Sequence, residues 1–241
     1  EGTALLILAF ESSAKAASVA LLREDMLLGE YYQNCGQTHS RTLLKMAEDL
    51  MENCGVSAAD ITTVACSAGP GSFTGVRIGM AAAKGFSWAK ELPCVGVSTL
   101  EAMAHQAGAF NGLVVCAMDA RRDQIYHAVF SREGGELRRI REDCAVSLEE
   151  AAEMLKNEKK EKIIVGDGAV LCYNVLQKFV PSCILAPEQL RHQRASGVAL
   201  AARQLLLRGE TGDAAALAPN YLRLSQAERE RNERLTKSKG E

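Results

Sequence analysis

The order of strand-like and helix-like segments occurs twice along this chain, and that duplication limits the possible folds more than any other feature. The first half shows three short apolar runs, then an amphipathic helix, then alternating strands and helices, at residues 4–10, 18–22, 26–32, 39–54, 61–68, 74–91, 92–97 and 99–106. The second half repeats this plan at residues 113–119, 124–130, 136–141, 148–157, 162–166 and 169–179. We therefore expect an α/β protein whose duplicated βββαβα halves form two lobes.

The duplication also divides the chain into domains. We expect a first lobe at residues 1–107, which carries the helices 39–54 and 74–91, and a second lobe at residues 108–224. The remaining residues, 225–241, are dense in charge and almost free of apolar side chains. Such a composition predicts a helical extension or a disordered tail.

Charge and cysteine usage exclude several classes of protein. Lys and Arg number 28 against 30 for Asp and Glu, a net charge of −2, so the chain has no basic excess for binding nucleic acid by charge alone. The eight cysteines lie far apart without C-x-x-C spacing, which is typical of reduced thiols in the cytoplasm. No apolar run approaches the ~18 residues of a membrane span, so we expect a soluble, cytoplasmic protein.

The stretch SAGPGSFTGVRIG at residues 67–79 is rich in glycine, as phosphate-binding loops are, and we compare it with two such motifs. It is not a P-loop, because no Gly-Lys-Ser/Thr follows Gly69 at the required spacing, and it lacks the third glycine of a dinucleotide fingerprint. Small residues instead recur every four positions, at Gly71, Gly75, Gly79 and Ala83. On a helix they form one bare stripe, which packs either on its own sheet or on another subunit.

Motifs for metal binding and acid–base chemistry are sparse. The four histidines include no H-x-x-x-H pair, so no metal site is expected, and His39 is interpreted as a polar contact near a helix start. The acidic candidates are Glu11 and Asp119, which end the first strand of each half and could hold Mg²⁺ beside a nucleotide. Neither is followed by the glycines that let a phosphate approach the backbone.

Several strings resemble one known family when they are taken together. They extend from residue 7 to residue 223 and read ILAFESSAKAASVALL, HSRTLL, SAGPGSFTGVRIG, DARRDQIYHAVF, IVGDGA and PNYLR. This combination resembles the TsaB (YeaZ) family. The resemblance implies the ASKHA fold of actin, Hsp70 and sugar kinases, with RNase H-like halves.

The resemblance further implies a non-catalytic scaffold subunit of the bacterial tRNA N6-threonylcarbamoyladenosine synthase complex. Its partners would be the catalytic paralogue TsaD, the ATPase TsaE and a second copy of the chain. TsaD would transfer the threonylcarbamoyl group to the adenosine beside the anticodon, with tRNA bound through the complex and no membrane contact. No cofactor would be required, and weak nucleotide binding would be possible.

Two sets of site residues follow from the resemblance, and neither is catalytic or metal-binding. The helices 39–54 and 74–91 would contact TsaD or a second copy through His39, Leu43, Ala47, Leu50, Met51, Gly71, Phe73, Thr74, Gly75, Arg77, Gly79 and Ala83. A vestigial nucleotide cleft would contain Glu11, Ser12, Ser13, Asp119, Arg121, Gly166, Asp167 and Gly168. A leucine at Gly75 or Gly79 would then weaken association and leave the monomer folded.

The alternative function is an ATP-dependent small-molecule kinase of the same fold. In that case Glu11 and Asp119 would hold Mg²⁺, and the isolated chain would turn over ATP. The absence of a phosphate-binding loop from the sequence favours the scaffold.

Overall fold

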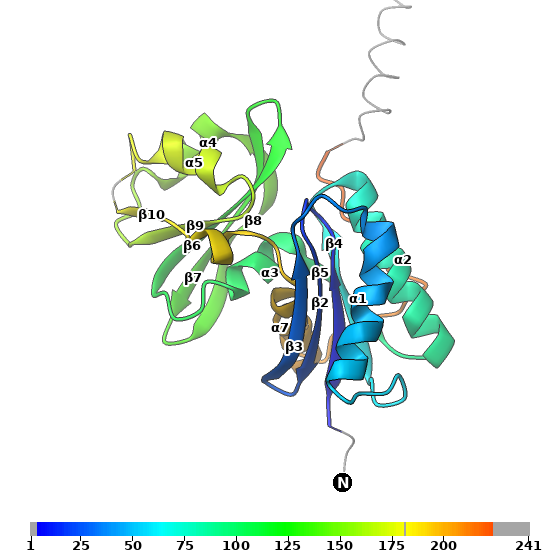
Figure 1. Cartoon of the computed structure of the whole chain (residues 1–241). Helices are drawn as coiled ribbons and strands as arrows, with labels where there is room; N and C mark the ends of the chain where they lie inside the picture. The colour runs from blue at the N-terminus through cyan, green and yellow to red at the C-terminus, as the bar shows by residue number, and fades with distance from the viewer. Residues whose placement is uncertain (1–3, 181, 224–241) are drawn as a thin grey trace, which may run out of the picture.

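Each half of the chain forms a five-stranded mixed sheet in the computed structural model, which describes residues 4–180 and 182–223 (Figure 1). The first sheet has the order β3-β2-β1-β4-β5 and consists of Met26–Gln33, Ala17–Arg23, Leu6–Glu11, Thr63–Gly69 and Cys94–Ser98. The second has the order β10-β9-β6-β7-β8 and consists of Cys183–Leu185, Lys162–Val165, Gly112–Arg121, Gln124–Glu133 and Glu136–Ser147. In each sheet the three sequential strands pair antiparallel and the strands that follow helices pair parallel. The expected pair of βββαβα units is confirmed.

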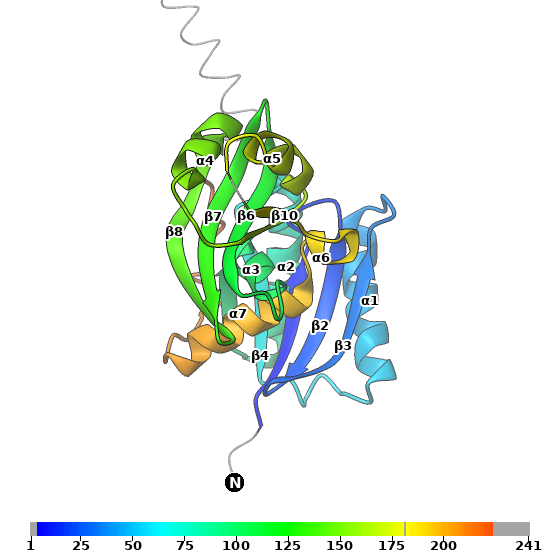
Figure 2. The same ribbon diagram turned by 90° about the vertical axis from the view of Figure 1, so that its left-hand side faces the viewer.

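Helices form three layers around these sheets. The outer face of the first sheet is covered by α1 (His39–Asn53) and α2 (Phe73–Lys90), and the outer face of the second by α4 (Leu148–Leu155) and α5 (Ala169–Leu176). Between the sheets lie α3 (Thr99–His105) and α7 (Ala195–Leu207), as Figures 1 and 2 show. A short helix, α6 (Glu188–Arg191), precedes α7.

The alternation of side chains along the central strands accounts for this layering. In β6, Leu113 and Val115 join the core under α4 and α5, whereas Val114 and Cys116 join the core around α3. Successive side chains of a strand point to opposite faces, so a strand with a helix layer on each side is apolar throughout. All six residues of β1 are accordingly buried.

The predicted boundary of the second lobe needs a correction. The helix α7 packs on the first sheet, where its small residues Ala195, Ala199 and Ala202 lie against Ile7 and Ala9. The chain beyond it stays with the first lobe, since Cys94 N of β5 donates to Gly212 O at 3.2 Å. Residues 195–217 thus pack on the first lobe. The sequence could not show this, because a helical apolar pattern does not specify which sheet the helix covers.

The small-residue stripe of α2 faces inward. A Cβ on Gly75 would lie 2.1 Å from Ser12 O, and one on Gly79 would lie 2.5 Å from Ser12 Oγ. Ala83 is fully buried in the core under α2. Of the two open possibilities, the structure shows packing within the chain at these positions, because the β1–β2 turn occupies the space beside the stripe.

The remaining expectations concern the thiols, the tail and the membrane. No disulfide joins any of the eight cysteines, all of which lie within the described residues. The predicted tail at residues 225–241 lies outside the described residues. Within the described part of the chain, no helix combines the length and the apolarity that crossing a bilayer requires.

Candidate functional site

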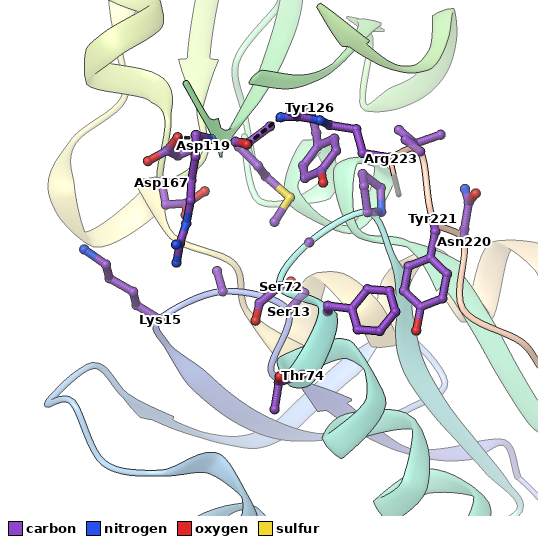
Figure 3. Close-up of a pocket in the computed structure, with 18 residues that line it drawn as sticks. Ser13, Lys15, Ser72, Thr74, Asp119, Tyr126, Asp167, Asn220, Tyr221 and Arg223 are labelled. Carbon is purple, nitrogen blue, oxygen red and sulfur yellow. Dashed lines mark hydrogen bonds between the residues drawn. The ribbon is translucent and has the colours of Figure 1, made fainter. Parts of the chain in front are cut away.

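A cavity of about 590 Å³ lies between the two lobes. Loops from both sheets and the end of the described chain contribute its side chains (Figure 3). The lining residues are Ser13, Ala14, Lys15, Pro70, Gly71, Ser72, Phe73, Thr74, Met118, Asp119, Ala120, Arg121, Tyr126, Asp167, Asn220, Tyr221, Leu222 and Arg223. This is the place where the sequence predicts a vestigial nucleotide cleft.

The first-lobe wall combines the β1–β2 turn with the beginning of α2. Ser72 N donates to Ser13 O at 2.7 Å, which holds the two loops together. The Ser72 hydroxyl caps α2 by accepting from Gly75 N at 3.2 Å. The amino end of a helix carries a partial positive charge, and Lys15 adds a full one to this wall. This wall therefore favours an anionic group.

The second-lobe wall is the turn between β6 and β7 together with Asp167. Asp119 Oδ1 accepts a hydrogen bond from Arg121 N at 2.7 Å, inside a turn with positive φ at Arg121, Arg122 and Asp123. Burial raises the pKa of Asp167, whose Oδ1 also accepts from Gln193 Nε2 at 3.0 Å. The cavity therefore holds carboxyl groups as well as the cations Lys15 and Arg121.

Glu11 lies beneath the cavity and does not line it. Its side chain is fully buried, with Ser67 Oγ donating to one carboxyl oxygen and Ser13 N donating to the other at 2.6 Å. Burial raises the pKa of Glu11, and these hydrogen bonds oppose that shift. Of the two acids, Asp119 lines the cavity and Glu11, which was predicted as part of the cleft, does not. Among the described residues, no three His, Cys, Asp or Glu side chains form a metal-binding group.

Some of the other residues predicted for the cleft line the cavity, and others lie outside it. Ser13, Asp119, Arg121 and Asp167 line the cavity, whereas Ser12 is buried behind it and donates from Oγ to Gly75 O at 2.9 Å. The two glycines around Asp167 shape the turn through their backbone: Gly166 N donates to Arg191 O at 2.7 Å and Gly168 N donates to Ala117 O at 3.0 Å.

The residues predicted to form the partner interface do not lie on one surface of the structure. Gly71, Phe73 and Thr74 line the cavity, and His39 Nε2 lies 2.8 Å from Ala14 O beside it. Met51 is half-buried and Arg77 is exposed. The rest form the core under α1 and α2, namely Leu43, Ala47, Leu50, Gly75, Gly79 and Ala83. They cannot offer side-chain surface to a partner, because they already pack inside the lobe.

The exposed side of the same two helices is apolar at several positions. Leu44 on α1 is 58% exposed and Trp88 on α2 is 77% exposed. Between the ends of α2, Ala81 and Gly85 are exposed, and a Cβ on Gly85 would meet nothing within 4 Å. We refer to Leu44, Arg77, Ala81, Gly85 and Trp88 as the α1–α2 face.

The last described residues cross the rim of the cavity, although the sequence predicted no functional residue among them. Asn220 N donates to Ala68 O at 2.6 Å, and the Tyr221 ring stacks on Phe73 with centroids 4.3 Å apart. Arg223 Nη1 donates to Ala120 O of the other lobe at 2.7 Å. Their only signal in the sequence is the string PNYLR, which marks no known chemistry by itself.

Comparison with known proteins identifies the family. The family described as "TsaD: tRNA N6-adenosine threonylcarbamoyltransferase" matches residues 33–231. A "tRNA threonylcarbamoyladenosine biosynthesis protein TsaB" of Bacillus subtilis is 31% identical to this chain, over 93% of the chain and 96% of that protein. The chain belongs to the TsaB family.

Other TsaB relatives and solved structures agree with this placement. The TsaB of Escherichia coli is 38% identical over 67% of this chain and 71% of its own length. The structure titled "YeaZ from Pseudomonas aeruginosa" superposes with a TM-score of 0.77 at 29% identity, covering 90% of this chain and 100% of that one. A tRNA N6-adenosine threonylcarbamoyltransferase of Streptococcus mutans is 34% identical over 42% of this chain and 33% of its own length. TsaB-family and transferase sequences thus share a recognisable part of this fold.

Proposed function

We propose that this TsaB-family chain is a non-catalytic subunit of the bacterial tRNA N6-threonylcarbamoyladenosine synthase, and that it binds and activates the catalytic paralogue TsaD. The activity would take place in the cytoplasm, where tRNA is modified, with TsaE as the associated ATPase and tRNA bound through the complex. The observation that carries the proposal is the exposed apolar α1–α2 face, which lies beside the cavity.

The non-catalytic role is supported by the arrangement of the acids. The kinase alternative requires Glu11 and Asp119 to face the same cavity, because their carboxylates would be the Mg²⁺ ligands there. Here Glu11 is buried under the serine turn and Asp119 is exposed on the opposite lobe. Phosphoryl transfer by this chain would require the β1–β2 turn to unfold locally, so the kinase alternative has little support.

The docking role is supported by the α1–α2 face. Trp88 and Leu44 present large apolar side chains to water, and the exposed Ala81 and Gly85 lie on the same side of α2 as Trp88. A helix that lies along this side of α2 can approach its backbone closely at Ala81 and Gly85 and cover the apolar side chain of Trp88. The partner would be TsaD, and in its absence a second copy of the chain would use the same face.

The cavity remains suited to weak nucleotide binding. Its cations Lys15 and Arg121 and the amino end of α2 would face phosphate groups, while Asp119 and Asp167 limit how much negative charge it accepts. No cofactor would be needed for the scaffold role. Titration of the isolated chain with Mg-ATP should give at most millimolar affinity and no turnover, whereas tight binding with hydrolysis would favour the kinase.

The decisive experiment measures threonylcarbamoyl transfer to tRNA. TsaD and TsaE of the same organism are supplied with threonylcarbamoyl-adenylate, ATP and substrate tRNA, with this chain present, omitted or alone. We expect product only when the chain is present with TsaD and none from the chain alone. Full activity without the chain would refute the proposal.

The docking face is tested with a matched pair of aromatic variants. Trp88→Ala removes an exposed ring from the α1–α2 face, and Phe179→Ala removes a similarly exposed ring, 66% exposed, from the second lobe. Only Trp88→Ala should weaken TsaD binding, by tenfold or more if the ring is a central anchor. Equal effects of the two variants would place the interface elsewhere.

A further inference from the structure

Two strings that lie far apart in the sequence meet at the beginning of α2. The glycine-rich stretch at residues 67–79 provides Ala68, Gly69, Phe73 and Arg77, and the string PNYLR provides Asn220 and Tyr221. The chain passes so close that a Cβ on Gly69 would lie 2.5 Å from Asn220 O, and Gly69 has φ +109°, which favours glycine. The close approach of the two segments therefore depends on a glycine at position 69.

Tyr221 is held there by three kinds of contact. Its ring stacks on Phe73 with an interplanar angle of 17°. Its hydroxyl accepts a hydrogen bond from Arg77 Nε at 2.7 Å, while the Arg77 guanidinium lies 3.9 Å from the centroid of Phe73. The residue is nevertheless 39% exposed. A fixed aromatic ring that faces water loses little conformational entropy on binding.

The position of Tyr221 continues the α1–α2 face. Arg77, Ala81, Gly85 and Trp88 follow one another at spacings of four, four and three residues, so they lie along one side of α2. The rise from Arg77 to Trp88 is about 16 Å. Tyr221 lies at the Arg77 end of this line and Trp88 at the other, with small residues between them (Figure 3 shows the Tyr221 end).

The charge of α2 indicates what kind of helix fits. The helix carries Arg77, Lys84 and Lys90 and contains no acidic residue. None of the ion pairs among the described residues uses these three cations. A helix with a small or apolar centre and acidic flanks would complement the surface in both shape and charge.

We propose that residues 220–223 form part of the docking face and that Tyr221 is its second aromatic anchor, opposite Trp88. The occupant is a helix of the TsaD partner with acidic flanks, so this inference rests on the proposed function. Aromatic and arginine side chains supply most of the binding energy in many interfaces. Because Arg223 holds the same segment to the second lobe, the anchor is positioned before the partner arrives.

The experiment measures the affinity of the full-length chain for TsaD by titration calorimetry. Four proteins are compared: the unaltered chain, Tyr221→Ala, Tyr221→Phe and the control Phe179→Ala. We expect Tyr221→Ala to weaken binding at least tenfold, Tyr221→Phe to weaken it less than threefold because the stacked ring remains, and Phe179→Ala to leave it unchanged. Circular dichroism and the midpoint of thermal unfolding establish that each variant is folded.

A second measurement does not depend on any variant. Amide hydrogen exchange of residues 219–223 is followed in the unaltered chain with and without TsaD, and added protection is expected in the complex. The inference would be overturned if Tyr221→Ala bound TsaD with unchanged affinity, or if TsaD added no protection to residues 219–223. Either result would leave an interface that depends on Trp88 intact. A chain that does not bind TsaD at all would overturn both this inference and the proposed function.

Discussion

Two glycines of the same helix should respond in opposite ways to the same substitution. Gly75 and Gly85 both lie within α2, where alanine is favoured over glycine by ~1 kcal/mol of helix propensity. Gly85→Ala adds a methyl group where nothing lies within 4 Å, so the free energy of unfolding should rise by about 1 kcal/mol. The thermal midpoint should then rise by roughly 2–4 °C for a chain of this size.

Gly75→Ala meets an obstacle that outweighs this gain. The new Cβ would lie 2.1 Å from Ser12 O, about 1.3 Å inside the 3.4 Å at which ordinary contact begins. Ser12 cannot retreat freely, because its hydroxyl donates to Gly75 O at 2.9 Å and the next residue, Ser13, donates to Glu11 at 2.6 Å. Overpacking of this kind costs ~1–3 kcal/mol, and each hydrogen bond that breaks adds about 1 kcal/mol. We expect a net loss of about 2 kcal/mol.

The assay is thermal and urea-induced unfolding of the two variants beside the unaltered chain. The variants should differ by about 3 kcal/mol, with Gly75→Ala the less stable. This reverses the expectation from the resemblance that even a leucine at Gly75 leaves the monomer intact. If Gly75→Ala unfolds at the same midpoint as Gly85→Ala, then the stripe does not pack against the β1–β2 turn and the reasoning fails.

Two further predictions concern the second lobe and its contact with the first. Burial lowers the pKa of His127 from 6.5 to about 4, so its contribution to stability is present at pH 7 and is lost as the pH falls through 6.5 towards 4. Between pH 7 and pH 5, the free energy of unfolding should fall by about 2 kcal/mol less in His127→Gln than in the unaltered chain. Urea unfolding at each pH measures this difference. An equal fall in the two proteins would contradict the prediction. Arg139 of β8 binds Asp143 at 2.5 Å and reaches Glu101 of α3 in the first lobe at 2.7 Å. Arg139→Ala should lower the free energy of unfolding by roughly 2 kcal/mol because both carboxylates lose a partly buried partner, and a loss no larger than that of the exposed Arg138→Ala would count against this interlobe contact.

The sequence alone predicted most of the secondary structure, because apolar periodicity is a local property. The helix expected at 74–91 is α2, Phe73–Lys90, and the strand expected at 113–119 is the core of β6, Gly112–Arg121. Errors lie at the ends, where β8 continues to Ser147 although its apolar pattern stops earlier, and at the short helix α6. Edge strands and single-turn helices are held by neighbours, which periodicity does not record.

The family could also be named from the sequence, because a set of strings spread over the chain is specific even when no single string is. The sequence could not predict whether a stripe of small residues on a helix faces the core of its own lobe or the solvent. Gly75 and Gly85 lie in the same helix and are equally bare, yet one is buried against Ser12 and the other is open to water.

What only the tertiary structure decided is which distant segments share a surface. Spacing suggested that Glu11 and Asp119 end equivalent strands, but the serine turn buries the first and leaves the second exposed. The stacking of Tyr221 on Phe73 joins positions that no local pattern connects. A sequence determines its local conformations through its own backbone and nearest side chains, whereas burial and contact depend on how sheets and helices pack across the whole chain, and a site is made of such contacts.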